Sequence, residues 1–155
     1  MGISAAICSA RLGRGAAHGL FATAAMTGFM LAGRGLGLVD PPSPEAVVSG
    51  ALEKVDLDST IRTPARTALV AVLHPFYGAA VGAVFELVMS RRGEPSAIRG
   101  GVYGLAVWAL GYLGWLPGFG ILPSPSRQGA GRHVVNVSSH LVYGCVLGVL
   151  SARSR

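Results

Sequence analysis

The sequence predicts an all-α integral membrane protein, a four-helix bundle made of two tandem two-helix repeats that together form a single transmembrane domain over residues 1–155. Composition is the first reason, because 51% of the residues are hydrophobic, 13% are charged and the mean hydropathy is +0.53. A soluble domain carries about twice that charged fraction. The second reason is that long apolar segments alternate with polar intervals. The third is a motif, His-x-x-Tyr-Gly-x-x-x-Gly, that occurs at residues 74–82 and again at 140–148.

Glycine and the basic residues are distributed as in a membrane protein. The chain has 23 glycines, and glycine is common in membrane helices because it lets backbones approach closely. The formal net charge of +6 would suit nucleic acid only if the basic residues gathered on one soluble face. Here the arginines stand at the ends of apolar runs. The lipid bilayer is therefore the expected partner, and nucleic acid is not.

The first membrane helix is expected at about residues 15–38. No residue from Gly15 to Gly33 is charged, and this stretch approaches the roughly 20 residues that cross a bilayer. A signal peptide is the alternative, because Arg11 and Arg14 precede the apolar stretch. The run is longer than the core of a signal peptide, and no small-x-small cleavage site stands clear after it. We therefore expect a retained span.

A polar interval at 40–66 separates the first helix from the second. It begins with Ser43-Pro44-Glu45, which predicts a helix start with an N-cap serine, a proline in the first turn and an early acid. We expect a short surface helix with its apolar stripe turned to the membrane, or a helix that covers the mouth of the bundle. The stripe consists of Val47, Val48, Ala51, Leu52 and Val55.

The other three membrane helices are expected at about 67–90, 100–122 and 133–152. The first of these is interrupted only by His74 and Glu86. Each is bounded by arginines, as membrane helices are.

The helix expected at 100–122 carries an aromatic stripe, because Trp108, Tyr112 and Trp115 recur at helical spacing. Such a stripe is more typical of a lipid-facing or packing surface than of a cofactor site. Trp115, just before Pro117, suits the aromatic belt at a membrane interface.

Four spans place both termini on one side of the membrane. The lysine and arginine counts on the two sides nearly balance, so the first helix decides the orientation, as it usually does. Arg11 and Arg14 precede this helix, and Arg34 alone follows it closely. We expect a multi-pass protein of the cytoplasmic (inner) membrane with both termini in the cytoplasm.

The two halves of the sequence repeat one another beyond the histidine motif. The pattern Arg-Gly-x-x-x-Gly-Leu opens the first helix at residues 14–20 and the third at 99–105. Each repeat crosses the membrane twice, so the copies share one orientation and are related by a pseudo-two-fold axis along the membrane normal. A bundle in lipid is held by close backbone approach. The glycines expected at helix contacts are Gly78, Gly82, Gly144 and Gly148.

His74 and His140 are the first candidates for a site. Each lies eight residues inside a boundary arginine, Arg66 or Arg132, which is roughly 12 Å into the membrane at about 1.5 Å per residue. An ionisable group at that depth faces the bundle interior and marks a candidate site.

Three interpretations of the histidines stay open. In the first, they are neutral and bond across the bundle to a nearby polar side chain, which is Tyr77, Tyr143, Ser138, Ser139 or Asn136. In the second, they are titratable relays in a proton or solute pathway. In the third, they are the axial ligands of one b-type haem. Apart from that haem, no cofactor and no metal site is expected.

Glu86 and His18 form a second candidate, because they lie at matching depths near the cytoplasmic ends of their helices. We expect Glu86 to face the bundle and to pair with His18 or to reach toward Arg91 or Arg92. A boundary carboxylate that reaches the lipid headgroups is the alternative. Pro75 and Glu86 occur in the first repeat alone, so a site should lie where the halves differ.

The sequence has no phosphate-binding loop, no zinc-ligand spacing and no nucleophile elbow, so an enzyme is not indicated. Three motifs, at residues 99–105, 104–117 and 140–148, resemble those of the YagU-like family of small bacterial and archaeal inner-membrane proteins of unknown function. The resemblance implies a four-span inner-membrane protein and brings no assigned reaction.

We therefore expect a small-solute or proton pathway, or a packing subunit that assembles with another membrane protein or with copies of itself. A haem b protein that uses His74 and His140 is the alternative.

Overall fold

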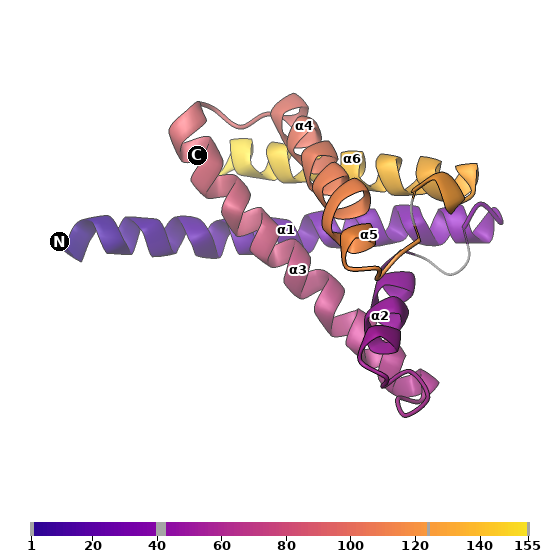
Figure 1. Ribbon diagram of the computed structural model, residues 1–155. Helices are drawn as coiled ribbons and strands as arrows, with labels where there is room; N and C mark the ends of the chain where they lie inside the picture. Colours follow the sequence, from indigo (N-terminus) through magenta and orange to yellow (C-terminus); the bar gives the residue numbers. More distant parts are fainter. Residues whose placement is uncertain (1, 40–42, 124, 155) are drawn as a thin grey trace.

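The computed structural model describes residues 2–39, 43–123 and 125–154, and its regular secondary structure there is helical (Figure 1). These residues contain no β-strand, so the predicted all-α class is confirmed. In chain order the elements are α1 (Gly2–Gly35), α2 (Ser43–Lys54), α3 (Thr63–Arg92), α4 (Ala97–Trp108), the π-helix η1 (Ala109–Trp115), α5 (Leu116–Gly118), the 3-10 helix η2 (Pro125–Arg127) and α6 (Ala130–Arg153).

Three helices within the described residues are long and apolar enough to cross a membrane, namely Cys8–Gly35, Thr63–Met89 and Ala130–Arg153. They lie in α1, α3 and α6. Many large apolar side chains on the outside of the molecule are exposed, for example Phe21 and Phe76. Apolar exposure on this scale is unusual for a soluble monomer. Together these features indicate a membrane protein.

α1 is longer than the sequence predicted. The expected span began near residue 15, whereas the helix begins at Gly2, because the preceding residues are rich in alanine and contain no proline. At the other end Gly37 has a φ of 71°, and the N–H of Leu38 bonds to the carbonyl of Gly33 at 3.0 Å. This glycine-capped end stops the helix at Gly35.

The third predicted span, 100–122, is not one long α-helix. α4 has 12 residues, and the seven-residue η1 and the short α5 continue it to Gly118. In η1 the N–H of Leu116 bonds to the carbonyl of Gly111, which is the π pattern. Glycine is a weak helix former and Pro117 has no N–H, so the regular α ladder is not continued. The described residues therefore hold three candidate spans, where the sequence predicted four.

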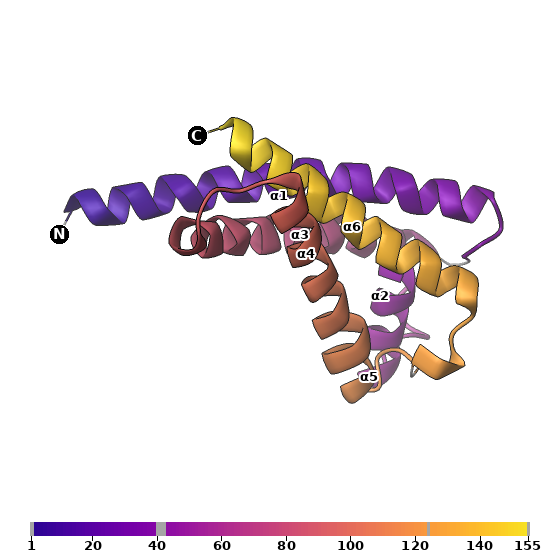
Figure 2. The same ribbon diagram turned by 90° about the horizontal axis from the view of Figure 1, so that it is seen from above.

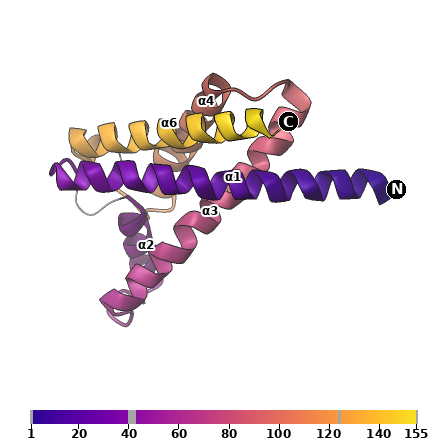
Figure 3. The ribbon, with the colours of Figure 1, turned by 180° about the vertical axis from the view of Figure 1, so that it is seen from behind.

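Each long helix packs on another. α1 contacts α3, α4 contacts α6, and α1 also contacts α6. Figures 1 and 3 show α1 and α6 side by side and running in opposite directions, with α3 crossing α1 diagonally. Figure 2 shows α4 leaving that layer at a steep angle to α6. α3 and α4 are therefore inclined to the α1–α6 pair rather than aligned with it as in a regular four-helix bundle.

Glycines form the contact between α1 and α3. A Cβ atom added to Gly15 would lie 2.6 Å from the carbonyl oxygen of Gly82, and one added to Gly82 would lie 2.7 Å from Cα of Gly19. Gly78 faces Gly19 and Thr23 just as closely. The two backbones touch here because side chains are absent.

The contact between α4 and α6 is made in the same way. A Cβ atom on Gly100 would lie 2.9 Å from Cα of Gly148, and one on Gly144 would lie 3.0 Å from the backbone nitrogen of Gly104. All four glycines that the sequence singled out for packing thus lie where two helix backbones meet.

The buried apolar core lies between α1, α3 and α6. Phe85 of α3 extends it to α4 by packing against Tyr103, with 5.1 Å between ring centroids. α2 packs on α3, and Val48 of its apolar stripe is buried. The other core residues include Ala22, Met26, Met30, Met89, Val135 and Leu147.

Replacing Gly144 with alanine is expected to destabilise the protein by about 1–3 kcal/mol, because the new Cβ overpacks a contact that has no room for it. Thermal unfolding of the purified protein in detergent measures the change as a lowered midpoint. Gly28→Ala is the matched control, since nothing lies within 4 Å of a Cβ at Gly28 and alanine favours a helix. Equal midpoints for the two variants would contradict the proposed contact.

Candidate functional site

Both predicted intramembrane histidines line one cavity of about 710 Å³, which we call the histidine cavity. His74 comes from α3 and His140 from α6. α2 contributes its whole predicted apolar stripe to the wall, and α1, α3 and the α4–η1 segment supply most of the rest. The wall is therefore mainly apolar, with two imidazoles set into it.

His140 is held in one orientation. Its Nδ1 lies 2.8 Å from the carbonyl oxygen of Asn136, and its ring meets Tyr112 edge to face, with 5.7 Å between centroids. A carbonyl oxygen only accepts, so Nδ1 carries the proton and donates it. In the neutral ring Nε2 is then the nitrogen with a free lone pair.

His74 presents a polar atom without a partner. Its Nε2 is buried and bonds to none of the groups that the structure describes. A buried polar group left unsatisfied costs about 1–3 kcal/mol. A hydrogen-bonding group of a molecule in the cavity would remove that cost.

The two predicted tyrosines have different surroundings. Tyr77 lines the histidine cavity and is half exposed. Tyr143 is buried, also lines the cavity, and donates its hydroxyl to the carbonyl oxygen of Gly78 at 2.7 Å. The Tyr143 hydroxyl is thus used to tie α6 to α3.

Asn136 links α6 to α2. Its side chain is buried, and its Oδ1 accepts a hydrogen bond from the Ser43 hydroxyl at the start of α2. Its Nδ2 is also buried and has no partner among the described groups. Among the predicted histidine partners, Asn136 bonds to the His140 imidazole through its backbone carbonyl. The Asn136 side chain and the Tyr143 hydroxyl bond to other groups.

Glu86 lies where α1, α3 and α6 meet, and it is only 1% exposed. The imidazole Nδ1 of His18, its candidate partner, lies 3.6 Å from Oε1. The Ser151 hydroxyl of α6 donates to the same carboxylate oxygen. The alternative partners, the side chains of Arg91 and Arg92, lie outside the described part of the chain.

The Glu86 site and the histidine cavity are separate. Glu86 follows His74 by 12 residues in α3, which is about 18 Å along a helix. Between them α3 touches α1 at Gly78 and Gly82. This backbone contact lies between the two sites along α3.

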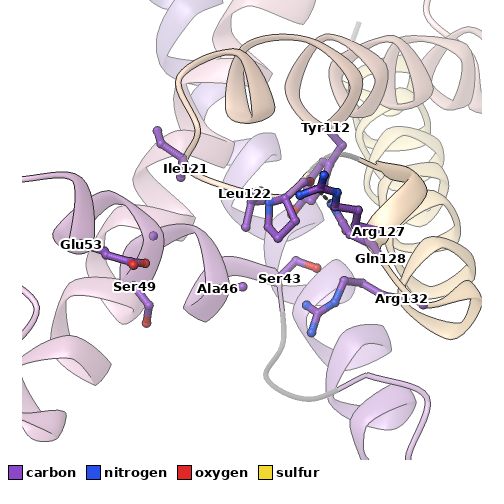
Figure 4. A pocket seen from close by; sticks show the side chains of 13 residues that line it. Ser43, Ala46, Ser49, Glu53, Tyr112, Ile121, Leu122, Arg127, Gln128 and Arg132 are labelled. Carbon is purple, nitrogen blue, oxygen red and sulfur yellow. Dashed lines mark hydrogen bonds between the residues drawn. The ribbon is translucent and has the colours of Figure 1, made fainter.

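A second pocket, of about 400 Å³, adjoins the histidine cavity, and we call it the arginine pocket (Figure 4). Arg127, Gln128 and Arg132 lie on one side of it, and α2 lies on the other with Ser49 and Glu53. Two further residues, Ser43 and Tyr112, line both this pocket and the cavity.

Sequence reasoning missed several polar residues of these sites. Ser151 falls one position away from the residue that matches Glu86 in the repeat, so the repeat did not indicate it. Tyr112 and Trp115 were assigned to an aromatic stripe with Trp108, but both line the histidine cavity. The π-helix shifts their register, which regular helical spacing cannot foresee.

No three histidine, cysteine, aspartate or glutamate side chains come together as a metal site within the described residues. Two histidines line one cavity, and histidine is one of the residues that can ligate a haem iron.

Comparison with curated proteins gives no match, and comparison with solved structures gives none either. Comparison with protein families gives a match over residues 9–155, which include the glycine contacts, the histidine cavity and the Glu86 site. The resemblance to the YagU-like proteins is not tested by this match and stays a prediction. The chain belongs to DUF6789, a family of unknown function.

Proposed function

We propose that the protein is a four-span protein of the cytoplasmic membrane that holds a small, largely apolar solute in the histidine cavity and gives it part of a path across the bilayer. The observation that carries this proposal is the wall of the cavity, which is apolar apart from a few inward-facing polar groups. Its volume of about 710 Å³ falls within the roughly 300–1,000 Å³ of ligand cavities, which combine apolar walls with a few placed polar groups.

We propose that the helical run from Ala97 to Gly118 is the fourth membrane span. It is unbroken across α4, η1 and α5, and its length approaches the roughly 30 Å of a hydrocarbon layer. Ile98, Val102 and Leu110 on this run are exposed and apolar, as lipid-facing residues are. Figure 1 shows the C-terminal end of α6 directed toward the same end of the molecule as the start of α1, which supports termini on one side.

We propose that α1 and α3 form the first hairpin, and that the α4–η1–α5 run and α6 form the second. Glycines mediate the helix contact within each pair, which supports two copies of one unit related by a pseudo-two-fold axis. The position of the helix contact differs between the two copies by one helical turn. Gly78 faces Gly19 and Thr23, whereas its counterpart Gly144 faces Gly100 and Gly104, the counterparts of Gly15 and Gly19.

Three hydrogen bonds join the two hairpins. The hydroxyl of Tyr103 in α4 donates to the carbonyl oxygen of Val81 at 2.8 Å. Tyr143 bonds to Gly78 in the same manner, and Ser151 bonds to Glu86. Two of these bonds, at Gly78 and Val81, lie in the wall of the cavity. The wall also carries the exposed side chains of Leu73, Phe76 and Trp115. A solute would enter from the lipid past these exposed side chains.

A solute suits the cavity better than a proton relay does. A relay needs a chain of polar groups across the bilayer, but the glycine contacts between α1 and α3 separate the two histidines from Glu86. The wall around the histidines is mainly apolar, which favours a molecule with an apolar body and one hydrogen-bonding group.

Haem b is the second candidate, and the orientation of His140 favours it. A ligating histidine usually donates its other ring N–H to a carbonyl or carboxylate, as His140 does to Asn136. Its Nε2 is then available for iron, and the Nε2 of His74 has no described partner. Both imidazoles line the same cavity, so His74 and His140 are the residues that would hold the haem.

Filling the cavity is expected to displace the solute. Ala51→Phe adds a ring to the cavity wall and should lower the amount of small molecule that co-purifies with the protein by about tenfold. Native mass spectrometry of the protein released from detergent measures the bound fraction. Ala106→Phe, on an exposed position of α4, is the control and should retain the adduct. Equal adducts in both variants would contradict a solute in this cavity, and the same spectra report the oligomeric state and any stoichiometric partner.

The haem candidate is tested by absorption. If haem is bound, the purified protein has a Soret band that is lost in both His74→Ala and His140→Ala, because each histidine supplies one axial ligand. His18→Ala lies in the separate Glu86 site and should keep the band. A colourless protein at full yield would exclude haem.

The hydrogen bond between Ser151 and Glu86 is expected to stabilise the contact between the two hairpins. Ser151→Ala should cost about 1–3 kcal/mol of unfolding free energy, since the buried carboxylate loses this donor. Glu86→Gln should cost less, because its amide oxygen still accepts. A double-mutant cycle, measured by unfolding in mixed detergent, should give a coupling of about 1 kcal/mol. Ser59→Ala, at an exposed turn, is the control, and zero coupling would refute the contact.

A further inference from the structure

We propose that the histidine cavity and the arginine pocket together hold one anionic amphiphile, a phospholipid whose phosphate group lies in the arginine pocket and whose apolar chain lies in the histidine cavity. This inference rests on the proposed function, because it names the class of molecule that the cavity takes. The phosphate group could also belong to a free anion, and the test separates these two sources.

The two spaces adjoin one another. Ser43 and Tyr112 line both, so a molecule that passes between these side chains has one part in each space. Both residues carry a hydroxyl group, and Arg132 lines the arginine pocket with them. Two polar side chains therefore mark the boundary between a polar space and an apolar one.

The charge of the arginine pocket suits a phosphate group. Arg127 and Arg132 bring two guanidinium groups to its wall, on the side that leads into α6. A planar guanidinium matches the oxygens of a phosphate group and binds them in pairs. Glu53, the acidic residue in the wall, belongs to α2, and Figure 4 shows it at the far end of the pocket from the arginines.

The position of the two spaces suits a lipid rather than a soluble phosphate compound. The arginine pocket lies at the ends of helices, beside the connection between α5 and α6, whereas the histidine cavity lies along the apolar length of α3. A phospholipid has the same order of parts, with a charged head at the boundary and apolar chains inside. Leu73 and Phe76, exposed at the edge of the cavity, provide a lateral opening through which a chain can pass from the bilayer.

The test uses native mass spectrometry of the full-length protein with added lipid. Phosphatidylglycerol and phosphatidylcholine with the same acyl chains are compared at equal concentration. We expect about tenfold greater retention of phosphatidylglycerol, since its net negative charge is not cancelled by a choline group. Replacing both pocket arginines with glutamine should reduce phosphatidylglycerol to the level of phosphatidylcholine.

Control variants keep the result interpretable. Arg127→Gln alone, on an exposed side chain, should give an intermediate loss even if the Arg132 variant folds poorly. Arg62→Gln removes an exposed arginine outside both spaces and should leave the lipid preference unchanged. An unchanged preference in Arg127→Gln, or an equal loss in Arg62→Gln, would overturn the proposal.

Inorganic phosphate distinguishes the two sources of the anion. Millimolar phosphate should leave phosphatidylglycerol bound, because the chain contributes to binding. Full displacement by phosphate would overturn the lipid assignment in favour of a soluble anion.

The cavity-filling variant separates this inference from the proposed function. Ala51→Phe should weaken the binding of both lipids. If it removes other adducts while the arginine variants leave the lipid preference intact, the solute cavity stands and the lipid inference fails. If neither kind of variant changes any adduct, both fail.

Discussion

Backbone contact between glycine faces is the constraint on which the rest of the structure depends. Lipid chains are as apolar as the helices, so no hydrophobic effect drives the helices together, and close packing has to do so. α1 meets α3, and α4 meets α6, where side chains are absent. The α1–α3 contact also sets the position of the polar residues on α3. His74 lies one turn before Gly78 and Glu86 one turn after Gly82, so one faces the cavity beside the contact and the other is buried beyond it.

The polar groups inside the helices fall into two kinds. Tyr103, Tyr143 and Glu86 accept or donate hydrogen bonds across the boundary between the two helix pairs. Such groups are costly in an apolar surrounding unless paired, and here the pairing joins the helices. His74 and His140 are different, because they line a cavity and His74 Nε2 has no described partner. Polar groups that hold the fold together are thus distinct from those available to a ligand.

α2 makes the cavity a bounded space. Its apolar stripe would otherwise face the lipid headgroup region, but it packs on α3 and forms one wall of the histidine cavity. The polar start of the same helix, at Ser43, lies where the cavity meets the arginine pocket. One short helix therefore supplies both an apolar wall and a polar boundary, which is the arrangement that an amphiphilic ligand requires.

The sequence by itself determined the membrane class and the position of the three long apolar helices, because the cost of placing charge in lipid depends on composition and run length. It also singled out His74, His140, Glu86 and His18, since an ionisable residue deep in an apolar run is unusual wherever the helix packs. The tertiary structure alone decided that Ser151 meets Glu86 and that α2 covers the cavity. It also placed Tyr112 and Trp115 in the cavity wall. These features depend on how helices cross and on the π-helix, which rotates the following residues out of regular register. Helical spacing in the sequence predicts neither the helix crossings nor the π-helix.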